Sequence, residues 1–109
     1  MNSIEWLQRW YWERCDNEWE HKDGVTIRSM DNPGWLVKIS LTGTPLEGAT
    51  MQAVGKLSDV NHFGTEGKQD WMHCSVEGEY FVGAGGPFSL LPICDVFRNW
   101  VEEKIGQNQ

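Results

Sequence analysis

Basic residues are scarce in this sequence. Lysine and arginine number 9 against 16 aspartates and glutamates, which gives a formal net charge of −7 at pH 7. Nucleic acids and anionic membranes both require a basic face, so the charge balance argues against either as a partner. An acidic domain suits a basic protein partner, because opposite electric fields accelerate encounter, although the same charge also serves solubility alone.

Cysteine is also scarce, and long apolar runs are missing. Cys15, Cys74 and Cys94 are odd in number and widely spaced, and no CxxC motif occurs. The first residues, "MNSIEWLQRWYW", lack the basic start and uniform apolar run of a signal peptide. No segment approaches the roughly 20 apolar residues of a membrane span. These absences together predict a cytoplasmic protein with reduced thiols.

Few residues are suited to metal chemistry. The richest stretch, "CDNEWEHKDG" at 15–24, combines a thiol, four carboxylates and an imidazole. The other histidines, His62 and His73, are distant in sequence, and neither an HExxH motif nor the acidic alternation of an EF-hand loop is present. His73 and its neighbour Cys74 on a predicted strand point to opposite faces. Neither a metal nor any other cofactor is therefore expected.

Motifs for catalysis and phosphate binding are missing too. Cys74 and Cys94 fall on the apolar faces of predicted elements, where cysteine behaves as a small hydrophobe rather than a nucleophile. The "GAGGP" run at 83–87 lacks the Lys-Ser/Thr of a P-loop and the GxGxxG pattern of a dinucleotide fold. Its glycines predict left-handed backbone or a close approach of strand and helix. These observations favour a protein that is not an enzyme.

Tryptophan is abundant, with seven in 109 residues. Some must anchor the core, and others are favoured interface anchors. Asn2 followed by Glu5 resembles a capping box and predicts a first helix that ends near Cys15. The inner stripe expected for this helix is Ile4, Leu7, Tyr11 and Cys15, widened by Trp6 and Trp10, with Trp12 at its edge.

Alternating apolar residues predict a sheet between two helices. Strands are expected over 25–30, 35–42, 51–57, 71–76 and 80–82, with Pro33-Gly34 turning the first two into a hairpin. Trp35 shares a strand face with Val37 and is expected to be buried against a helix. Ser89 is expected to cap a last helix. Residues 1–109 thus form a single α+β domain: an N-terminal helix, an antiparallel meander of four to five strands and a C-terminal helix, with the helices on one face.

The stretch at 15–24 then becomes a turn between the first helix and the first strand. Its carboxylates are expected to be mostly solvated and of little use to the fold. Trp19 belongs to no apolar periodicity, so it is either a lid over the seam between helix and sheet or an exposed anchor for a partner. Glu20 and His21 are placed to hydrogen-bond across the turn.

Three segments carry a family resemblance. "WLQRWYWERCDNEWEHKDGVTI", "MDNPGWLVKISLTGT" and "DWMHCSVEGEYFVGAGGP" resemble, in order and spacing, a family of bacterial immunity proteins numbered fifty-three, the antitoxin partners in polymorphic toxin systems. The similarity runs from Ile4 to about Trp100. The resemblance implies a cytoplasmic protein that binds and neutralises a cognate toxin domain, without catalysis. A nuclease toxin would present a basic substrate site, which an acidic antitoxin can cover or bind beside.

The resemblance supplies no functional residues, so the binding site is predicted from this chain alone. The loop at 58–69 is longer than the family pattern, which makes it a candidate for partner-specific contacts. The predicted partner-binding residues are Asp16, Glu18, Trp19, Glu20 and His21 in the first turn and Asp59, His62 and Glu66 in this loop.

Two other functions also fit the sequence. One is a small-ligand-binding α+β domain with tryptophans lining a pocket between the helices and the sheet. The other is a hydrolase with carboxylates around Asp16, Glu20 and Asp31. It would need a cleft that gathers these groups and raises their pKa values.

Overall fold

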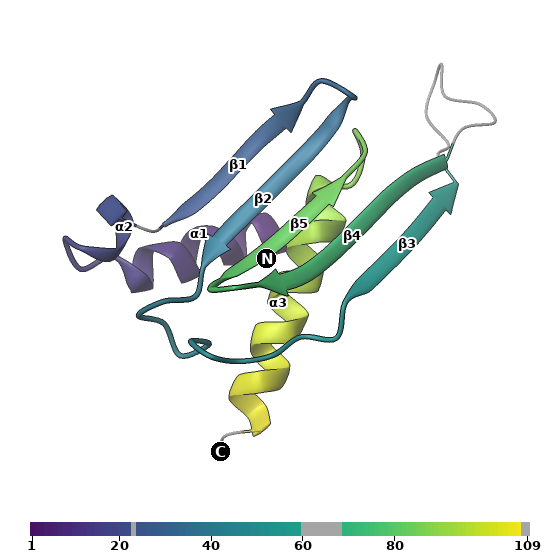
Figure 1. Ribbon diagram of the computed structural model, residues 1–109. Coiled ribbons are helices and arrows are strands. Elements are labelled where there is room, and N and C mark those ends of the chain that lie inside the picture. The colour runs from purple at the N-terminus through teal and green to yellow at the C-terminus, as the bar shows by residue number, and fades with distance from the viewer. Residues whose placement is uncertain (23, 60–68, 108–109) are drawn as a thin grey trace.

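The expected α+β layout is confirmed by a computed structural model that describes residues 1–22, 24–59 and 69–107. An N-terminal helix, an antiparallel sheet and a C-terminal helix follow one another along the chain (Figure 1). The elements are α1 (Ser3–Arg14), α2 (Trp19–Lys22), β1 (Val25–Met30), β2 (Gly34–Ser40), β3 (Val54–Asp59), β4 (Gln69–Glu77), β5 (Tyr80–Gly85) and α3 (Leu90–Gln107).

The order of the strands differs from that of a simple meander. The described residues form a five-stranded antiparallel sheet in the order β1-β2-β5-β4-β3. β2 pairs with β5, where Ile39 lies opposite Phe81, so β3 is displaced to the far edge. Residues 41–53 carry the chain across the end of the sheet to that edge (Figure 1). The most buried strands, β2 and β5, are therefore neighbours in the sheet although they are not consecutive in the chain.

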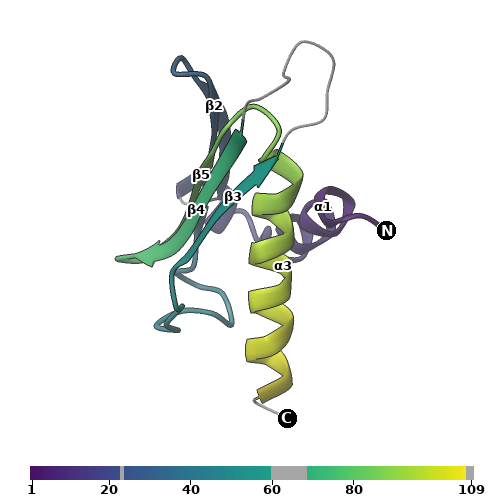
Figure 2. The same ribbon diagram turned by 90° about the vertical axis from the view of Figure 1, so that its right-hand side faces the viewer.

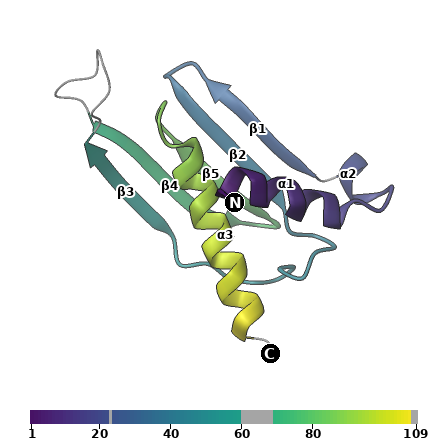
Figure 3. The same ribbon diagram turned by 180° about the vertical axis from the view of Figure 1, so that it is seen from behind.

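Both long helices lie on the same face of the sheet (Figures 2 and 3). The core fills the space between them and the sheet, where the rings of Phe81 and Phe97 lie 4.9 Å apart. Full burial of a side chain of this size stabilises the fold by roughly 1.5–3 kcal/mol. The described residues place no helix on the opposite face of the sheet (Figure 2).

The inner face of α1 is not the expected one. Its buried residues are Ser3, Leu7 and Trp10. Ile4 and Tyr11 are each 37 % exposed. The expected inner stripe is therefore right at Leu7 and wrong at Ile4 and Tyr11.

The reason lies in what α1 packs against. The rings of Trp6 and Trp10 meet Phe97 of α3 edge-on, with centroids 6.0 and 5.1 Å away. Tryptophan buries more apolar area than isoleucine or tyrosine, so the helix rotates toward its two indoles. The same rotation turns Trp12 outward, and its side chain is 75 % exposed.

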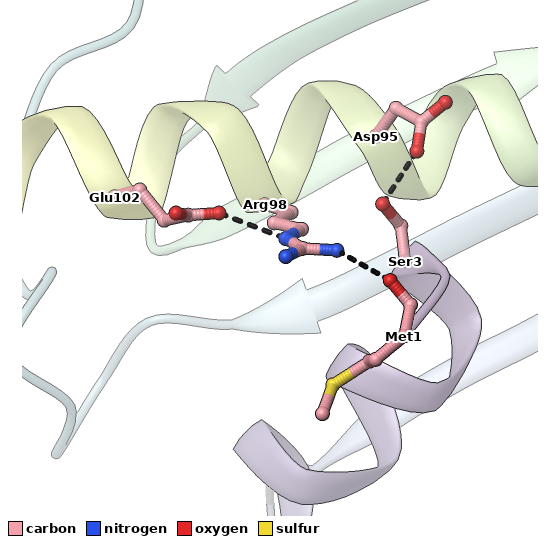
Figure 4. Close-up of polar contacts among 5 residues, drawn as sticks. All are labelled: Met1, Ser3, Asp95, Arg98 and Glu102. Carbon is pink, nitrogen blue, oxygen red and sulfur yellow. Dashed lines mark hydrogen bonds and ion pairs between the residues drawn. The ribbon is translucent and has the colours of Figure 1, made fainter.

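Polar contacts fix the start of α1 on α3 (Figure 4). The hydroxyl of Ser3 donates to the carboxylate of Asp95. Arg98 donates from Nη1 to the carbonyl of Met1 at 3.2 Å and from Nε to Glu102 Oε1 at 2.8 Å. The first residues of the chain are thereby joined to its last helix.

The glycines of the "GAGGP" run permit close packing. A Cβ on Gly83 would lie 2.4 Å from Ile93 Cγ2, and one on Gly86 would lie 1.6 Å from Asp70 Oδ1. Gly34, in the "DNPGW" turn, would bring a Cβ within 2.1 Å of the Gly85 carbonyl oxygen. Of the two expected uses of glycine, close approach is the one that the structure shows. The "DNPGW" turn and the "GAGGP" run, which both belong to segments that carry the family resemblance, are thus in contact.

Trp35 is half-buried at the end of β2. Its Nε1 donates to the carbonyl of Pro87 at 3.1 Å, so it packs against the loop before α3. The expectation of burial against a helix is wrong, because the hairpin of β1 and β2 extends past the start of α3, and Trp35 meets the loop before that helix instead (Figures 1 and 2). Val37 and Ile39, on the same face, are fully buried as expected.

Ser89 occupies the N-cap position of α3, as expected, since its carbonyl accepts from the N–H of Ile93 at 2.9 Å, but its hydroxyl does not cap the helix. Its hydroxyl donates to Asp70 and to the carbonyl of Trp71. Asp70 also accepts from the N–H of Phe88 at 3.0 Å. The buried carboxylate of Asp70 therefore fixes the loop that leads into the helix.

Candidate partner-binding surface

The turn after α1 is built by a capping aspartate. The helix ends as Cys15 N–H donates to the carbonyl of Trp12 at 3.2 Å. Asn17 adopts a left-handed φ of 73°, which asparagine tolerates better than most residues. Asp16 Oδ1 then accepts from the N–H groups of Glu18 and Trp19, each at 2.9 Å. Asp16 thus satisfies the N–H groups at the start of α2 from an Asx-type turn, two residues ahead of the N-cap position at Glu18, whose carbonyl accepts from the N–H of Lys22 at 3.1 Å.

Glu20 closes the same turn from the other side. Its carboxylate accepts from the N–H groups of Asp16 and Asn17, each at 2.9 Å. The N–H of Trp19, followed by that of Glu18, lowers the pKa of Asp16. The pKa of Glu20 is lowered by its own backbone N–H and by those of Asp16 and Asn17. The expectation that these carboxylates are of little use to the fold is therefore wrong.

Trp19 is a lid on the core. It is 5 % exposed, and its ring lies 5.8 Å from Trp10 and 5.9 Å from Tyr11. A Cβ built on Gly43 would lie 3.8 Å from Trp19 Cδ1, so the segment after β2 adjoins the indole. Of the two expected alternatives, the structure shows the lid, and the exposed anchor is wrong. His21 beside it is exposed.

Three further acids lie at the same end of the sheet as this turn (Figure 1). Leu41 N–H donates to the carbonyl of Glu79 at 2.9 Å, which brings the β4–β5 turn to the segment after β2. Ser40 N–H donates to the carbonyl of Gly24 at 3.1 Å, which adds the start of β1. We call this surface the acidic end; its exposed or half-buried carboxylates are Asp16, Glu18, Glu20, Glu47, Glu77 and Glu79. Sequence reasoning missed the last three because only the fold brings them near the first.

Of the remaining predicted binding residues, only Asp59 is placed by the structure. β3 ends at Asp59, at the end of the sheet away from α2 (Figure 1). His62 and Glu66 fall outside the described residues. The structure does not bring Asp59 together with the turn at 15–20. A binding role for either region stays a prediction.

The outer side of α1 carries a second candidate surface. We call it the outer stripe, and it consists of Ile4, Gln8, Tyr11 and Trp12, all exposed. It adjoins the acidic end, since the Tyr11 ring lies 5.9 Å from that of Trp19, which stands between Glu18 and Glu20. Interactions with Cys15 raise the pKa of Tyr11, and burial and then the charge of Glu20 add to the effect. The signal in the sequence was that α1 has two apolar stripes, of which a helix on a two-layer fold buries one.

The uncovered sheet face has a different character. Strand pairing places Arg28 opposite Leu36 and Lys38 opposite Val82 on this face. Lys38 Nζ lies 4.1 Å above the ring of Tyr80. The two cations make this face a poor complement to a basic partner.

The hydrolase alternative is contradicted by the positions of its carboxylates. Asp31 follows β1, whose six residues span about 20 Å and separate it from Asp16 and Glu20 at the other end. The pKa values of Asp16 and Glu20 are lowered, whereas a cleft for acid–base chemistry would raise at least one of them. No two of these three residues therefore form a catalytic pair of acid and base.

The tryptophans line two grooves. One of about 550 Å³ lies between α3 and residues 50–54, beside Trp100, and it reaches the edge of the sheet at Val54 of β3. Another of about 450 Å³ lies between α1 and α3, beside Trp6 and Trp10. Core side chains fill the space between the helices and the middle of the sheet.

The described residues show little provision for metal or thiol chemistry. Within 1–22, 24–59 and 69–107, no three His, Cys, Asp or Glu residues come together in a possible ion site. Burial raises the pKa of Cys74 to about 12 and that of Cys94 to about 11, so both thiols stay protonated in the core, where they were expected. No helix in the described part of the chain is long and apolar enough to cross a membrane.

Comparison with known proteins gives one result. Neither the curated proteins nor the solved structures contain a match to this chain. The sequence model of a protein family described as Immunity protein 53 matches residues 4–102, which covers α1, the whole sheet and most of α3. The resemblance carried by the three segments is thereby confirmed, and this chain belongs to the Immunity protein 53 family.

Proposed function

We propose that this chain is an antitoxin of a bacterial polymorphic toxin system. It binds a cognate toxin domain in the cytoplasm and blocks it by occupancy, without catalysis and without nucleic acid or membrane as partner. The observation that carries the proposal is membership in an immunity protein family over residues 4–102. The net charge of −7 supports a basic toxin domain as the partner.

The acidic end supplies the attraction in this proposal. Asp16 and Glu20 hold the turn through hydrogen bonds, yet neither is buried, so their charges still act outward. Glu18 and His21 are exposed beside them. A field of this kind raises the association rate more than it raises the final affinity. Contacts from Asp59, His62 and Glu66 remain the second candidate for partner binding.

The test is co-expression with the toxin domain encoded directly upstream of this chain's gene. Cells that carry both are expected to grow, and the two purified proteins are expected to form a complex. Cells that carry this chain with an unrelated toxin should die, which controls for general stress relief. Absence of both protection and complex would overturn the proposal.

A titration separates blocking from catalysis. If inhibition comes from occupancy, toxin activity falls linearly and reaches zero at equimolar antitoxin. Progressive loss of toxin activity at a tenth of that amount would show turnover, and the non-enzymatic part of the proposal would be wrong.

A further inference from the structure

We propose that the outer stripe of α1 is the docking surface for the toxin, with Trp12 as its central anchor. The identity of the partner rests on the proposed function above. The occupant is a protein surface with an apolar pocket rimmed by lysine or arginine side chains. Exposure, rigidity and charge support this choice in turn.

The outer stripe leaves apolar area exposed, most of it on Trp12, although Tyr11 also packs against Trp19. Trp12 is 75 % exposed, and Ile4 and Tyr11 are each 37 % exposed on the same side of the helix. Tryptophan and tyrosine are enriched among the few interface residues that dominate binding energy. A helical stripe of this spacing fits a groove on a partner.

α1 presents this stripe from a fixed position. Trp6 and Trp10 pack on Phe97, and Ser3 is hydrogen-bonded to Asp95. Trp19 covers the end of the helix from α2. Because the helix is already held, a partner has little order to impose on it when it binds.

Charge identifies the kind of partner. The stripe ends at the acidic turn, because α1 ends at Arg14, two residues before Asp16, and the Tyr11 ring lies 5.9 Å from that of Trp19, the neighbour of Glu18 and Glu20. The nearest cation of the helix end, Arg14, is turned over the Trp10 ring at 5.6 Å and pairs with Glu13 at 3.6 Å. A basic rim around the partner's pocket complements this edge.

The same charges argue against a second copy of this chain. A symmetric contact between two outer stripes would place the acidic turn of one copy near that of the other. Each copy has a net charge of −7, so electrostatic repulsion would oppose both the approach of the two copies and the close contact of their acidic turns. The occupant is therefore a basic partner rather than another copy.

The test compares Trp12→Ala with a matched control, Leu57→Ala. Leu57 is 68 % exposed, and it lies on β3 at the opposite edge of the sheet. Affinity for the toxin domain encoded directly upstream is measured by calorimetry, and melting temperature is measured for each variant. Trp12→Ala should weaken binding by about 30-fold or more, the loss that marks an interface hot spot. Leu57→Ala should change binding less than about threefold, and neither variant should melt earlier than the parent by more than a few degrees.

Each other outcome has a definite meaning. If Trp12→Ala binds like the parent, or if only Leu57→Ala weakens binding, the docking surface is not the outer stripe. If the parent is a dimer in light scattering and Trp12→Ala makes it a monomer, the occupant is a second copy, and the inference is wrong. If the parent itself fails to bind or protect, the proposed function fails, and the partner assigned to the stripe fails with it. Trp12→Arg should lose still more affinity than Trp12→Ala, because it adds a cation opposite a basic rim.

Discussion

At the scale of single residues, Asp16 and Glu20 carry two roles at once. Asp16 accepts N–H groups that the start of α2 would leave unsatisfied, and Glu20 accepts those of the turn residues Asp16 and Asn17. Each also keeps its charge in contact with solvent. Sequence reasoning expected Glu20 to hydrogen-bond across the turn, which is confirmed, but it treated the carboxylate of Asp16 as solvated charge. Aspartate often accepts from the backbone N–H two residues on, but only coordinates show where its oxygens point.

The first prediction concerns Asp16. Asp16→Ala should lower the melting temperature at pH 7, and Asp16→Asn, which keeps an acceptor oxygen but not the charge, should fall between Asp16→Ala and the parent. The folded pKa of Asp16 is below its ordinary value of 3.8, so the stabilisation by charge is full above that value and is lost as the pH falls below it. Melting curves from neutral to strongly acidic pH should therefore show the gap between parent and Asp16→Ala closing in acid. A gap that stays constant would show that ionisation is irrelevant.

The second prediction concerns the thiols. With pKa values raised to about 12 and about 11, Cys74 and Cys94 should resist a thiol reagent at pH 8 in the native protein. Cys15 is half-buried at the end of α1 and should react first. Mass spectrometry of the labelled protein should show one modified site before unfolding and three in denaturant. Early labelling of Cys74 would show that the core opens readily.

At the scale of elements, the sequence predicted which helices and strands form better than it predicted which of their faces are buried. The N-cap of α1 was legible, and Asn2 Oδ1 accepts from Glu5 N–H at 2.8 Å. Which face of α1 is buried was not legible, because both stripes have helical spacing and the choice depends on Phe97, distant in sequence. β5 was read as ending at 82, because glycines in a strand signal a break. Here they continue the strand where Ile93 and Ser89 leave no room for a Cβ.

The third prediction concerns that close packing. Gly86→Ala would place a Cβ 1.6 Å from Asp70 Oδ1, and Asp70 is 5 % exposed and hydrogen-bonded to Phe88 and Ser89. We expect a loss of about 3 kcal/mol or more in the free energy of unfolding, or failure to fold. Gly106→Ala in α3 is the matched control, since no atom lies within 4 Å of its Cβ position. It should stabilise the helix by up to about 1 kcal/mol. Urea denaturation of both variants provides the measurement, and equal stabilities would contradict the packing account.

At the scale of the whole molecule, charge is unevenly distributed. Carboxylates gather at the acidic end, whereas Arg28 and Lys38 occupy the uncovered sheet face. Composition alone predicted the net charge and hence a basic partner. It could not predict this separation, because Glu47, Glu77 and Glu79 join Asp16 only through the crossing of residues 41–53.

The fourth prediction concerns the rate of association. The combined change Asp16→Asn, Glu18→Gln and Glu20→Gln removes three charges while keeping acceptor oxygens for the turn. It should slow association with the toxin domain, and the slowing should shrink as salt rises. Trp12→Ala should instead act mainly by speeding dissociation.

The control for this prediction is Glu103→Gln, on the exposed side of α3. It removes one charge away from the acidic end and should change the rate far less per charge. Stopped-flow kinetics at two salt concentrations distinguish these outcomes. A slowing that is the same at both salt concentrations would show a lost contact rather than a lost field.

The strand order has a consequence for when this protein exists as a folded molecule. β5 lies at the centre of the sheet, and α3 supplies Phe97, against which α1 packs, yet both come last in the chain. A nascent chain that lacks residues 80–107 has neither its middle strand nor the helix to which its first residues are hydrogen-bonded. Non-local pairing of this kind makes folding late and slow. Under the proposed function, protection should therefore begin only after residues 80–107 have left the ribosome, so a cell would need a reserve of already folded protein before any toxin arrives.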